Sequence, residues 1–381
     1  MKIVRVNSHD KLFGLGDEIG TVPILQTTLG NYQKTICERL GLEFVELNDV
    51  QAFKNLTTPY FYFEAQCVFT KEFLQAAMQQ AKRDKFNTSF QFGLGITENS
   101  LTFSLPSEKA TQTRKMPFFF VGGNASELNY VELNGEEFEL LTPMPTQIVR
   151  TGHYSLNQNP VFAANIISPF HLLQANMGLN MNRCIGLQKL VPKSLRKSLA
   201  KPFGLFAILG LKSINKKGKN CRIHPSAIIE GCIIGDNVTI GANCVLRMSI
   251  IGSGSFIGDA AIVTYSVIGE RNFVATGNQL SLCLSYPQVF TIHGPYQFTI
   301  FGRSSAVFAT INCDIRLDQK TISIETDRGV LDSQQYLLGI AYGHEAKVGG
   351  SNIIAAGRFV PNGTVVNPPD FIHLKFPENE H

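Results

Sequence analysis

Two histidines in the C-terminal half of the chain could act as general bases. Imidazole gains and loses a proton near neutral pH, so it can remove a proton from an amine or a hydroxyl group. His344 lies in the segment AYGHEAKVGG and His224 lies in the segment IHPSA. Glu345 follows His344 directly and would point elsewhere, so the sequence does not identify the group that orients the ring. We expect His344 to be the catalytic candidate. A structural turn residue is the alternative for both histidines.

A second pair of polar residues, His293 and Arg303, lies in the segment TIHGPYQFTIFGR. The segment is otherwise rich in aromatic and β-branched residues, which is typical of strands. We expect these two side chains to contact an anion or an acceptor group of a substrate.

A periodic spacing of aliphatic residues indicates the architecture that positions these side chains. The series advances by five or six residues, and every third member recurs with a period of 17. The three columns are Ile223, Ile240, Ile257 and Val274; Ile229, Leu246, Val263 and Leu280; and Ile234, Ile251 and Ile268. One inward side chain on each of three faces stacks on its copy in the next coil. The sequence therefore predicts a three-sided parallel β-helix over residues 221–285.

The six-residue step resumes near the C-terminus, at Tyr342, Val348, Ile354, Val360 and Val366. We expect the β-helix to continue there, over residues 337–372. Between the two patches, residues 286–336 alternate Phe-rich and polar positions, as in QFTIFGRSSAVFATI and KTISIE. This alternation predicts a protruding β-rich insertion that shapes a binding site or a subunit contact.

The segments IGANCV, IGDAAI and VGGSNI each begin with an aliphatic residue and a small residue, with another small residue three positions later. This pattern resembles the hexapeptide-repeat family of left-handed β-helix proteins. Many of its members are trimeric acyltransferases in which a histidine is the general base and the acyl thioester lies between neighbouring prisms. In others, the β-helix only assembles or regulates a nucleotidyltransferase. The resemblance implies either acyl transfer involving His344 or an oligomerisation domain.

The N-terminal part alternates predicted strands and helices. MKIVRV and EFVELND are typical strands, and TLGNYQKTICERLG between them is typical of a helix that ends at Gly41. PYFYFEAQCVF predicts a further strand, and KEFLQAAMQQAKRDK predicts the next helix. This alternation predicts an α/β domain over residues 1–185.

An α/β domain in front of a β-helix is similar in layout to the sugar-phosphate nucleotidyltransferases. These include the bifunctional uridylyltransferase and acetyltransferase of N-acetylglucosamine 1-phosphate and the mannose-1-phosphate guanylyltransferases, whose first loop ends in Gly-Thr-Arg and holds the triphosphate. Here that loop keeps Gly14 and Gly16, but Asp17 and Glu18 replace Thr-Arg and would repel a triphosphate. The acid nearest to the expected metal-binding aspartate is Glu64. The resemblance implies a degenerate nucleotidyltransferase-like domain in which Gly14, Gly16 and Glu64 are the nucleotide-binding candidates.

The middle of the chain contains no acidic residue between Leu140 and Ile229, although twelve Lys or Arg occur there. Four lysines are spaced four residues apart with leucines between them, which predicts a basic amphipathic linker helix within residues 186–220. These lysines are Lys189, Lys193, Lys197 and Lys201. With the apolar segment PFGLFAILGL behind it, the helix would contact an anionic membrane surface. The alternative is an interdomain helix that caps the open end of the prism.

The composition sets further bounds. With 381 residues, 44% of them hydrophobic and 17% charged, the chain is typical of a globular protein of two or three domains. The N-terminus lacks a secretory signal pattern, so we expect a cytoplasmic protein. Eight cysteines occur without a CxxC pair, so we expect reduced thiols, no disulfide and no zinc. No recognised module accompanies the lysines, so we expect no nucleic-acid partner.

These features favour a homo-oligomeric transferase-family protein of sugar-nucleotide or acyl-group metabolism. Its N-terminal domain would bind a nucleotide-linked sugar, and its β-helix would take an acyl group from acyl-CoA or would assemble the subunits. Whether the protein is an enzyme stays open. One alternative is a non-catalytic scaffold or sensor derived from a nucleotidyltransferase. Another is an acyltransferase that acts on a lipid or envelope precursor at the membrane surface.

Overall fold

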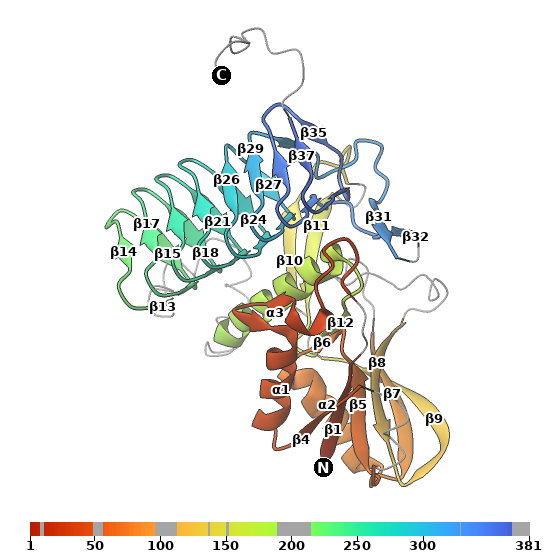
Figure 1. The fold of residues 1–381 in the computed structure, drawn as a ribbon. Coiled ribbons are helices and arrows are strands. Elements are labelled where there is room, and N and C mark those ends of the chain that lie inside the picture. Colours follow the sequence, from red (N-terminus) through yellow and green to blue (C-terminus); the bar gives the residue numbers. More distant parts are fainter. Residues whose placement is uncertain are drawn as a thin grey trace, which may run out of the picture.

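The computed structural model describes residues 1–7, 11–48, 56–95, 113–135, 138–149, 152–188, 215–327 and 329–367. A mixed α/β region forms the N-terminal part and a left-handed parallel β-helix forms the C-terminal part, with helix α3 (Pro169–Gln188) between them (Figure 1). Both parts of the predicted fold class are confirmed.

The N-terminal region is built on a six-stranded mixed sheet with the strand order β4-β1-β5-β8-β7-β9. Its strands are β1 (Lys2–Val6), β4 (Glu43–Leu47), β5 (Tyr60–Glu64), β7 (Thr88–Gly95), β8 (Thr113–Val121) and β9 (Asn124–Leu133). Strand β1 pairs in parallel with both β4 and β5, whereas β8 is antiparallel to β5 and β7. The carboxyl ends of β4, β1 and β5 therefore meet at one edge of the sheet, which is where ligands bind in many α/β folds.

The two predicted helices are present as α1 (Leu29–Arg39) and α2 (Lys71–Arg83). The N-cap residue of each is a threonine, and the hydroxyls of Thr28 and Thr70 accept backbone hydrogen bonds from Asn31 and Phe73. The apolar sides of both helices pack on an aromatic-rich sheet core. Its fully buried aromatic side chains are Phe61, Phe63, Phe69, Phe73, Phe92, Phe118 and Phe120.

The predicted single strand PYFYFEAQCVF is divided by a turn into β5 and β6 (Cys67–Phe69). The buried amide of Gln33 on α1 explains the division, because its Nε2 donates to the carbonyls of Ala65 and Cys67 at 2.9 and 2.7 Å. These two backbone carbonyls therefore accept hydrogen bonds from a side chain and not from a neighbouring strand. The remaining elements of the region are η1 (Ile19–Thr21), β2 (Pro23–Ile24), β3 (Thr27–Thr28), β10 (Phe138–Pro143), β11 (His153–Gln158) and β12 (Ala163–Asn165).

Short parallel strands form the three faces of the β-helix. The first face contains β13 (Lys216–Lys217), β16 (Ile233–Ile234), β19 (Ile250–Ile251), β22 (Val267–Ile268), β25 (Leu284–Ser285), β28 (Ile300–Phe301), β33 (Ala341–Tyr342) and β36 (Phe359–Val360). The second face contains β14 (Arg222–Ile223), β17 (Thr239–Ile240), β20 (Phe256–Ile257), β23 (Phe273–Val274), β26 (Phe290–Ile292), β29 (Ala306–Phe308), β34 (Lys347–Val348) and β37 (Val365–Val366). The third face contains β15 (Ile228–Glu230), β18 (Val245–Arg247), β21 (Ile262–Thr264), β24 (Gln279–Ser281) and β27 (Tyr296–Gln297), followed by the pair β30 (Ile311–Asn312) and β35 (Ile353–Ile354).

The strand register confirms the predicted columns. Ile223 pairs with Ile240, and Ile240 pairs with Ile257, each 17 residues further along the chain. The inward side chains form one core inside the prism, in which Ile257 and Leu246 are fully buried. Each coil therefore stabilises its neighbours through a continuous aliphatic stack.

The predicted start of the insertion at residue 286 is wrong, because the β-helix continues to Asn312. Here the coil shortens, so that Leu284 pairs with Ile300 at a spacing of 16 residues. Aromatic side chains also take over the inward positions, with the rings of Phe301 and Tyr342 stacked at 5.5 Å. The shorter coil and the larger inward side chains explain why the 17-residue aliphatic period did not predict these coils.

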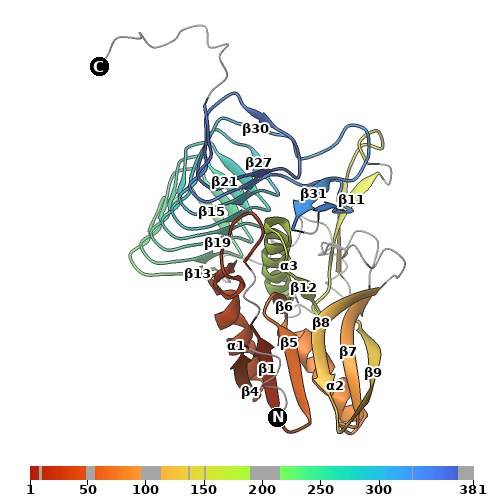
Figure 2. The same ribbon diagram turned by 45° about the vertical axis from the view of Figure 1, so that its right-hand side comes forward.

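The departure from the coil lies between β30 and β33. It contains the antiparallel hairpin of β31 (Ser323–Thr326) and β32 (Gly329–Asp332), which projects from the β-helix (Figure 2). The loop that follows β10 lies close to it, since Nε2 of Gln319 donates to the carbonyl of Gln147 at 2.8 Å. The insertion therefore contacts the N-terminal region.

A single apolar cluster joins the two parts of the molecule. On the first face, the outward side chains of Ile250, Val267 and Ile300 are buried in this cluster, together with apolar side chains of α3 and of the segment of residues 11–21, which we call the docking loop. The ribbon of α3 runs beside the β-helix (Figures 1 and 2). Residues 168–181 of the chain are all buried. Such a helix packs on both sides rather than along one stripe, which accounts for its lack of a polar face.

The lysines of the predicted basic helix, Lys189, Lys193, Lys197 and Lys201, lie outside the described residues. Among the helices that the structure does describe, none is both long enough and apolar enough to span a membrane.

Removing an inward side chain should show the importance of the stacked core. We expect Ile257→Ala to lower the free energy of unfolding by about 2 to 5 kcal/mol, because a fully buried isoleucine leaves a cavity. The matched control is Ile353→Ala, at a position that is 69% exposed, where a change within about 0.5 kcal/mol is expected. Urea unfolding followed by circular dichroism measures both; equal losses would contradict the stacked-core assignment.

Candidate functional site

A pocket of about 730 Å3 lies at the carboxyl ends of β1 and β4, beside the N-terminus of α1. Its wall combines residues of the two strands and the loops that follow them, the first residues of α1 and part of the docking loop. The lining residues are Arg5, Asn7, Lys11, Glu18, Ile19, Gly20, Thr21, Thr28, Gly30, Asn31, Lys34, Phe44, Glu46 and Asn48. We call it the Arg5 pocket.

Arg5 is the most buried charged residue of this pocket. Its side chain is 8% exposed, and its Nη1 donates to Oε1 of Glu46 at 2.9 Å. Its guanidinium packs against Gly20 and Gly30, where a Cβ would lie 2.6 and 3.0 Å from a guanidinium nitrogen. Nε of Arg5 is buried without a hydrogen-bond partner among the described residues. A buried, partly unsatisfied guanidinium favours an anion beside it.

The N-terminus of α1 adds to this preference. The N-terminus of a helix carries a partial positive charge that favours phosphate and carboxylate groups, although at α1 the N–H groups of Leu29 and Asn31 already donate to the carbonyl of Val22 and the hydroxyl of Thr28. The exposed amines of Lys11 and Lys34 also line the pocket, whereas Glu18 and Glu46 contribute two carboxylates. Three cations and a helix N-terminus against two anions suit a phosphate-bearing ligand.

The predicted nucleotide-binding residues do not line the Arg5 pocket. Gly14 and Gly16 have φ angles of 76° and 79° and form the tip of the docking loop. A Cβ on Gly14 would lie 2.9 Å from the ring of Phe359, so this glycine allows close packing on the β-helix. Glu64 is exposed at the end of β5, where its Oε2 accepts a hydrogen bond from Nε2 of Gln66 at 2.5 Å.

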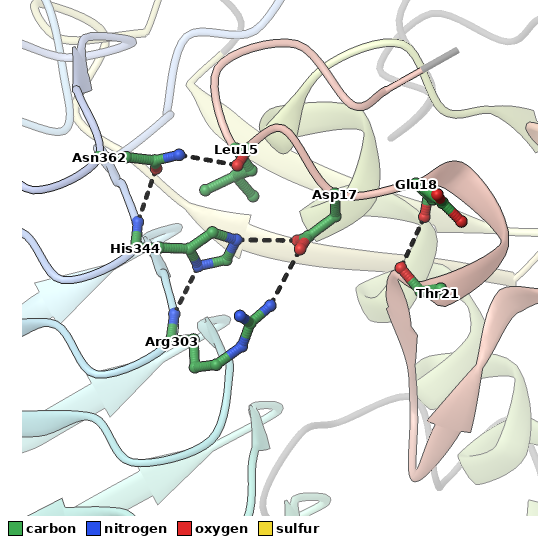
Figure 3. A network of polar contacts seen from close by, with 7 residues as sticks. All are labelled: Leu15, Asp17, Glu18, Thr21, Arg303, His344 and Asn362. Atoms are coloured by element: carbon green, nitrogen blue, oxygen red, sulfur yellow. Dashed lines mark hydrogen bonds and ion pairs between the residues drawn. The ribbon is translucent and has the colours of Figure 1, made fainter. Parts of the chain in front are cut away.

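A polar network joins the docking loop to one edge of the β-helix (Figure 3). Oδ2 of Asp17 lies 2.9 Å from Nε2 of His344, and Oδ1 of Asp17 accepts from Nη2 of Arg303 at 3.0 Å. Nδ2 of Asn362 donates to the carbonyl of Leu15 at 2.8 Å. The edge between the first and second faces, which carries Arg303, His344 and Asn362, is called the docking edge below. The structure thus brings two predicted site residues, Arg303 and His344, together with Asp17.

The backbone N–H of Arg303 donates to Nδ1 of His344 at 2.8 Å. Along the same edge, the side chains of Asp236 and Ser253 accept the backbone N–H of the preceding coil in the same way. Nδ1 of His344 therefore accepts a backbone hydrogen bond at a corner of the β-helix, which leaves Nε2 as the donor to Asp17. A general base needs an accessible lone pair, so such a role for His344 requires its contact with Asp17 to open.

The electrostatics of the network favour an ionised Asp17. Burial raises the pKa of this carboxyl, but the hydrogen bond from His344, the neighbouring hydroxyl of Tyr286 and the positive charge of Arg303 outweigh it, and the pKa lies below its ordinary value. Burial and the charge of Asp17 raise the pKa of Tyr286 well above 10.0. Asp17 is therefore a charged anchor in a largely enclosed site.

The other two histidine candidates lie elsewhere. His293, with a φ of 54°, occupies the edge between the second and third faces, away from the docking edge. His224 is exposed in the first coil, where its Nδ1 lies 2.8 Å from the hydroxyl of Ser226. The structure places His293 and Arg303, the two predicted substrate contacts, on different edges of the β-helix.

The described residues offer no cluster of three His, Cys, Asp or Glu side chains that could bind a metal ion. Burial raises the pKa of the Cys37 and Cys283 thiols to about 12. Thiolate chemistry is disfavoured at these two positions.

The lowered pKa of Asp17 gives a stability that depends on pH. A carboxyl whose pKa is lower in the folded than in the unfolded protein stabilises the fold at pH values above its ordinary pKa. This stabilisation is lost as the pH falls through the pKa of the folded state. We expect Asp17→Asn to cost about 1 to 3 kcal/mol near pH 7, and the difference from wild type to shrink below the ordinary carboxyl pKa of 3.8. Urea unfolding between pH 7 and pH 3 measures it. The control is Glu270→Gln, an exposed carboxylate on the docking edge; an Asp17→Asn difference that grew toward pH 3 would contradict the assignment.

Three comparisons bear on the identity of the chain. Residues 218–247 match the family described as bacterial transferase hexapeptide (six repeats), so the β-helix contains a repeat of that type. No curated protein matches in sequence. Among solved structures, a variant of perosamine N-acetyltransferase from Caulobacter crescentus, in complex with CoA and GDP-perosamine, is similar with 14% identity and a TM-score of 0.20. The similarity covers 42% of this chain and 60% of the length of that chain.

Proposed function

We propose that the protein is a transferase-family protein of sugar-nucleotide or acyl-group metabolism whose N-terminal domain binds a nucleotide-linked sugar in the Arg5 pocket. The hexapeptide transferase repeat of residues 218–247 supports the family assignment. The observation that carries the binding proposal is the buried guanidinium of Arg5, which faces the N-terminus of α1 in a pocket of about 730 Å3. A volume of this order accommodates a ligand of several hundred daltons.

The charge of the pocket favours the diphosphate of such a ligand over a neutral sugar. Guanidinium donates paired hydrogen bonds to phosphate oxygens, and the helix N-terminus adds the positive end of the helix dipole. The side chains of Asn7, Asn31 and Asn48 add polar groups that could select a sugar or a base. The proposed ligand class is the one that the sequence favoured. The proposed binding residues are those of the Arg5 pocket in place of Gly14, Gly16 and Glu64.

The role of the β-helix is either acyl transfer from acyl-CoA or assembly of subunits. While the docking loop contacts the β-helix, both ring nitrogens of His344 have hydrogen-bond partners. This geometry favours subunit assembly over acyl transfer as the role of the β-helix. This observation also supports the second candidate function, a non-catalytic scaffold or sensor that binds the nucleotide-linked sugar without turnover. The membrane-surface acyltransferase depends on lysines 189–201, which lie outside the described residues.

Reversing one charge of the pocket should weaken binding. We expect Lys34→Glu to reduce the affinity for UDP-N-acetylglucosamine or GDP-mannose by about tenfold or more, since a carboxylate then faces the diphosphate. Isothermal titration calorimetry measures the Kd. The matched control is Lys82→Glu, an exposed lysine in the last turn of α2 outside the pocket, for which wild-type affinity is expected. The proposal fails if wild type binds neither nucleotide-linked sugar, or if both variants weaken binding equally.

A ladder of aromatic side chains on the second face supports a homo-oligomer. The rings of Phe256 and Phe273, and of Phe273 and Phe290, stack with centroids 4.9 Å apart, and Phe308 extends the ladder at 5.4 Å. Phe256, Phe273 and Phe308 are 37 to 39% exposed. A continuous aromatic surface of this kind is typical of a subunit contact.

Disrupting the ladder should change the mass of the protein in solution. We expect Phe273→Glu to shift the protein toward the monomer in analytical ultracentrifugation, because a carboxylate would be buried in the contact. Leu128→Glu, on edge strand β9 at a position that is 59% exposed, is the matched control and should leave the mass unchanged. A monomeric wild type would contradict the proposed contact, as would an unchanged mass of Phe273→Glu.

A further inference from the structure

The docking loop has two sets of contacts at opposite ends. Its stem residues, Lys11 and Glu18 to Thr21, line the Arg5 pocket. Its tip residues contact the β-helix, where Leu12 and Leu15 are 1% and 2% exposed in the apolar cluster between the two parts of the molecule. One short segment therefore touches the ligand pocket and the docking edge.

Backbone hydrogen bonds within the docking loop fix the position of its tip relative to its stem. Lys11 and Glu18 form an antiparallel bridge, and the N–H of Leu12 donates to the carbonyl of Asp17 at 2.8 Å. The N–H of Gly16 donates to the carbonyl of Leu12 at 2.8 Å. Because these bonds fix the tip relative to the stem, holding Asp17 in place also holds Glu18 and the residues that follow it.

We propose that Arg303, His344 and Asn362 are positioning residues that hold the docking loop as a wall of the Arg5 pocket, so that docking on the β-helix and binding of a nucleotide-linked sugar strengthen each other. The inference rests on the proposed function of the pocket. A loop that is already ordered does not lose its conformational entropy when the ligand binds. Coupling between two sites is reciprocal, so the ligand also tightens the contact with the docking edge.

The charges support this arrangement. Asp17 does not line the pocket, and its carboxylate contacts Arg303 and His344 on the side of the β-helix. Its negative charge is compensated there, so it does not stand beside the diphosphate. Of the Asp-Glu pair that replaces the cationic end of a phosphate-binding loop, Asp17 is therefore neutralised outside the pocket, whereas Glu18 remains in the pocket wall together with Lys11 and Lys34.

Affinity measured on variants of the docking contact tests the coupling. The Kd for UDP-N-acetylglucosamine and for GDP-mannose is measured by calorimetry for wild type, Asp17→Asn, Arg303→Gln and the double variant. We expect each single variant to weaken binding about 5- to 50-fold. The double variant should be no weaker than the weaker single variant, because the two side chains act through one contact. Arg271→Gln, an exposed arginine on the same edge two coils before Arg303, should bind as wild type does.

Two further readouts separate positioning from a merely structural role. Asp17→Glu keeps the carboxylate and should recover most of the affinity that Asp17→Asn loses. Hydrogen exchange of residues 11–18 in wild type should slow when the nucleotide-linked sugar is added, and this protection should be absent in Arg303→Gln. The Arg303 side chain is 51% exposed, so this variant should fold even if Asp17→Asn does not.

The outcomes distinguish the two proposals. If wild type binds and the folded Arg303→Gln variant binds with the same Kd, the coupling is wrong while the pocket retains its proposed function. If the variants lose thermal stability without any change in Kd, the docking edge is only structural, and the coupling is likewise wrong. If wild type binds neither probe, the proposed function fails and the coupling fails with it.

Discussion

The covering of one apolar face of the β-helix is the constraint on which this structure depends. Strand residues alternate between inward and outward positions, so a coil that buries Ile251 inside the prism must direct Ile250 outward. On the first face the outward positions are aliphatic from β16 to β28, and α3 and the docking loop cover them. At about 25 cal/mol per Å2 of apolar surface, exposing such a face would be costly. The N-terminal region is therefore held against the β-helix as part of one core.

Two buried asparagines of α3 form hydrogen bonds to both parts of the molecule and help to fix their relative position. Asn176 of α3 accepts from the N–H of Leu25 at 2.7 Å and donates to the carbonyl of Pro23 at 2.9 Å. One turn later, Nδ2 of Asn180 donates to the carbonyl of Met248 at 2.8 Å. Buried amides of this kind tolerate only one arrangement, because any shift leaves a donor or an acceptor without a partner. The apolar surface provides the affinity between the parts, and these hydrogen bonds select the geometry.

The sequence predicted the β-helix well because its signal is local and repetitive. The prediction was wrong at residue 286 because the spacing fell from 17 to 16 residues and aromatic side chains replaced aliphatic ones at the inward positions. The helices α1 and α2 were predicted from their periodicity, and the end of α1 from Gly41. The Arg5 pocket was missed because it forms only when the sheet brings β1, β4 and the docking loop together. The signal that could have revealed it was a lone arginine within the apolar strand KIVRV. No sequence pattern pairs His344 with Asp17, which lies 327 residues earlier in the chain.

The hydrogen bonds along the docking edge have a consequence for how this protein could evolve. Aspartate, serine, histidine and asparagine accept the equivalent backbone N–H at four corners of this edge. At these corners the fold requires only a short acceptor and leaves the remaining atoms of the side chain free to face outward. A row of such interchangeable positions lets mutation rewrite the chemistry of one edge a single residue at a time, while the winding of the solenoid stays unchanged.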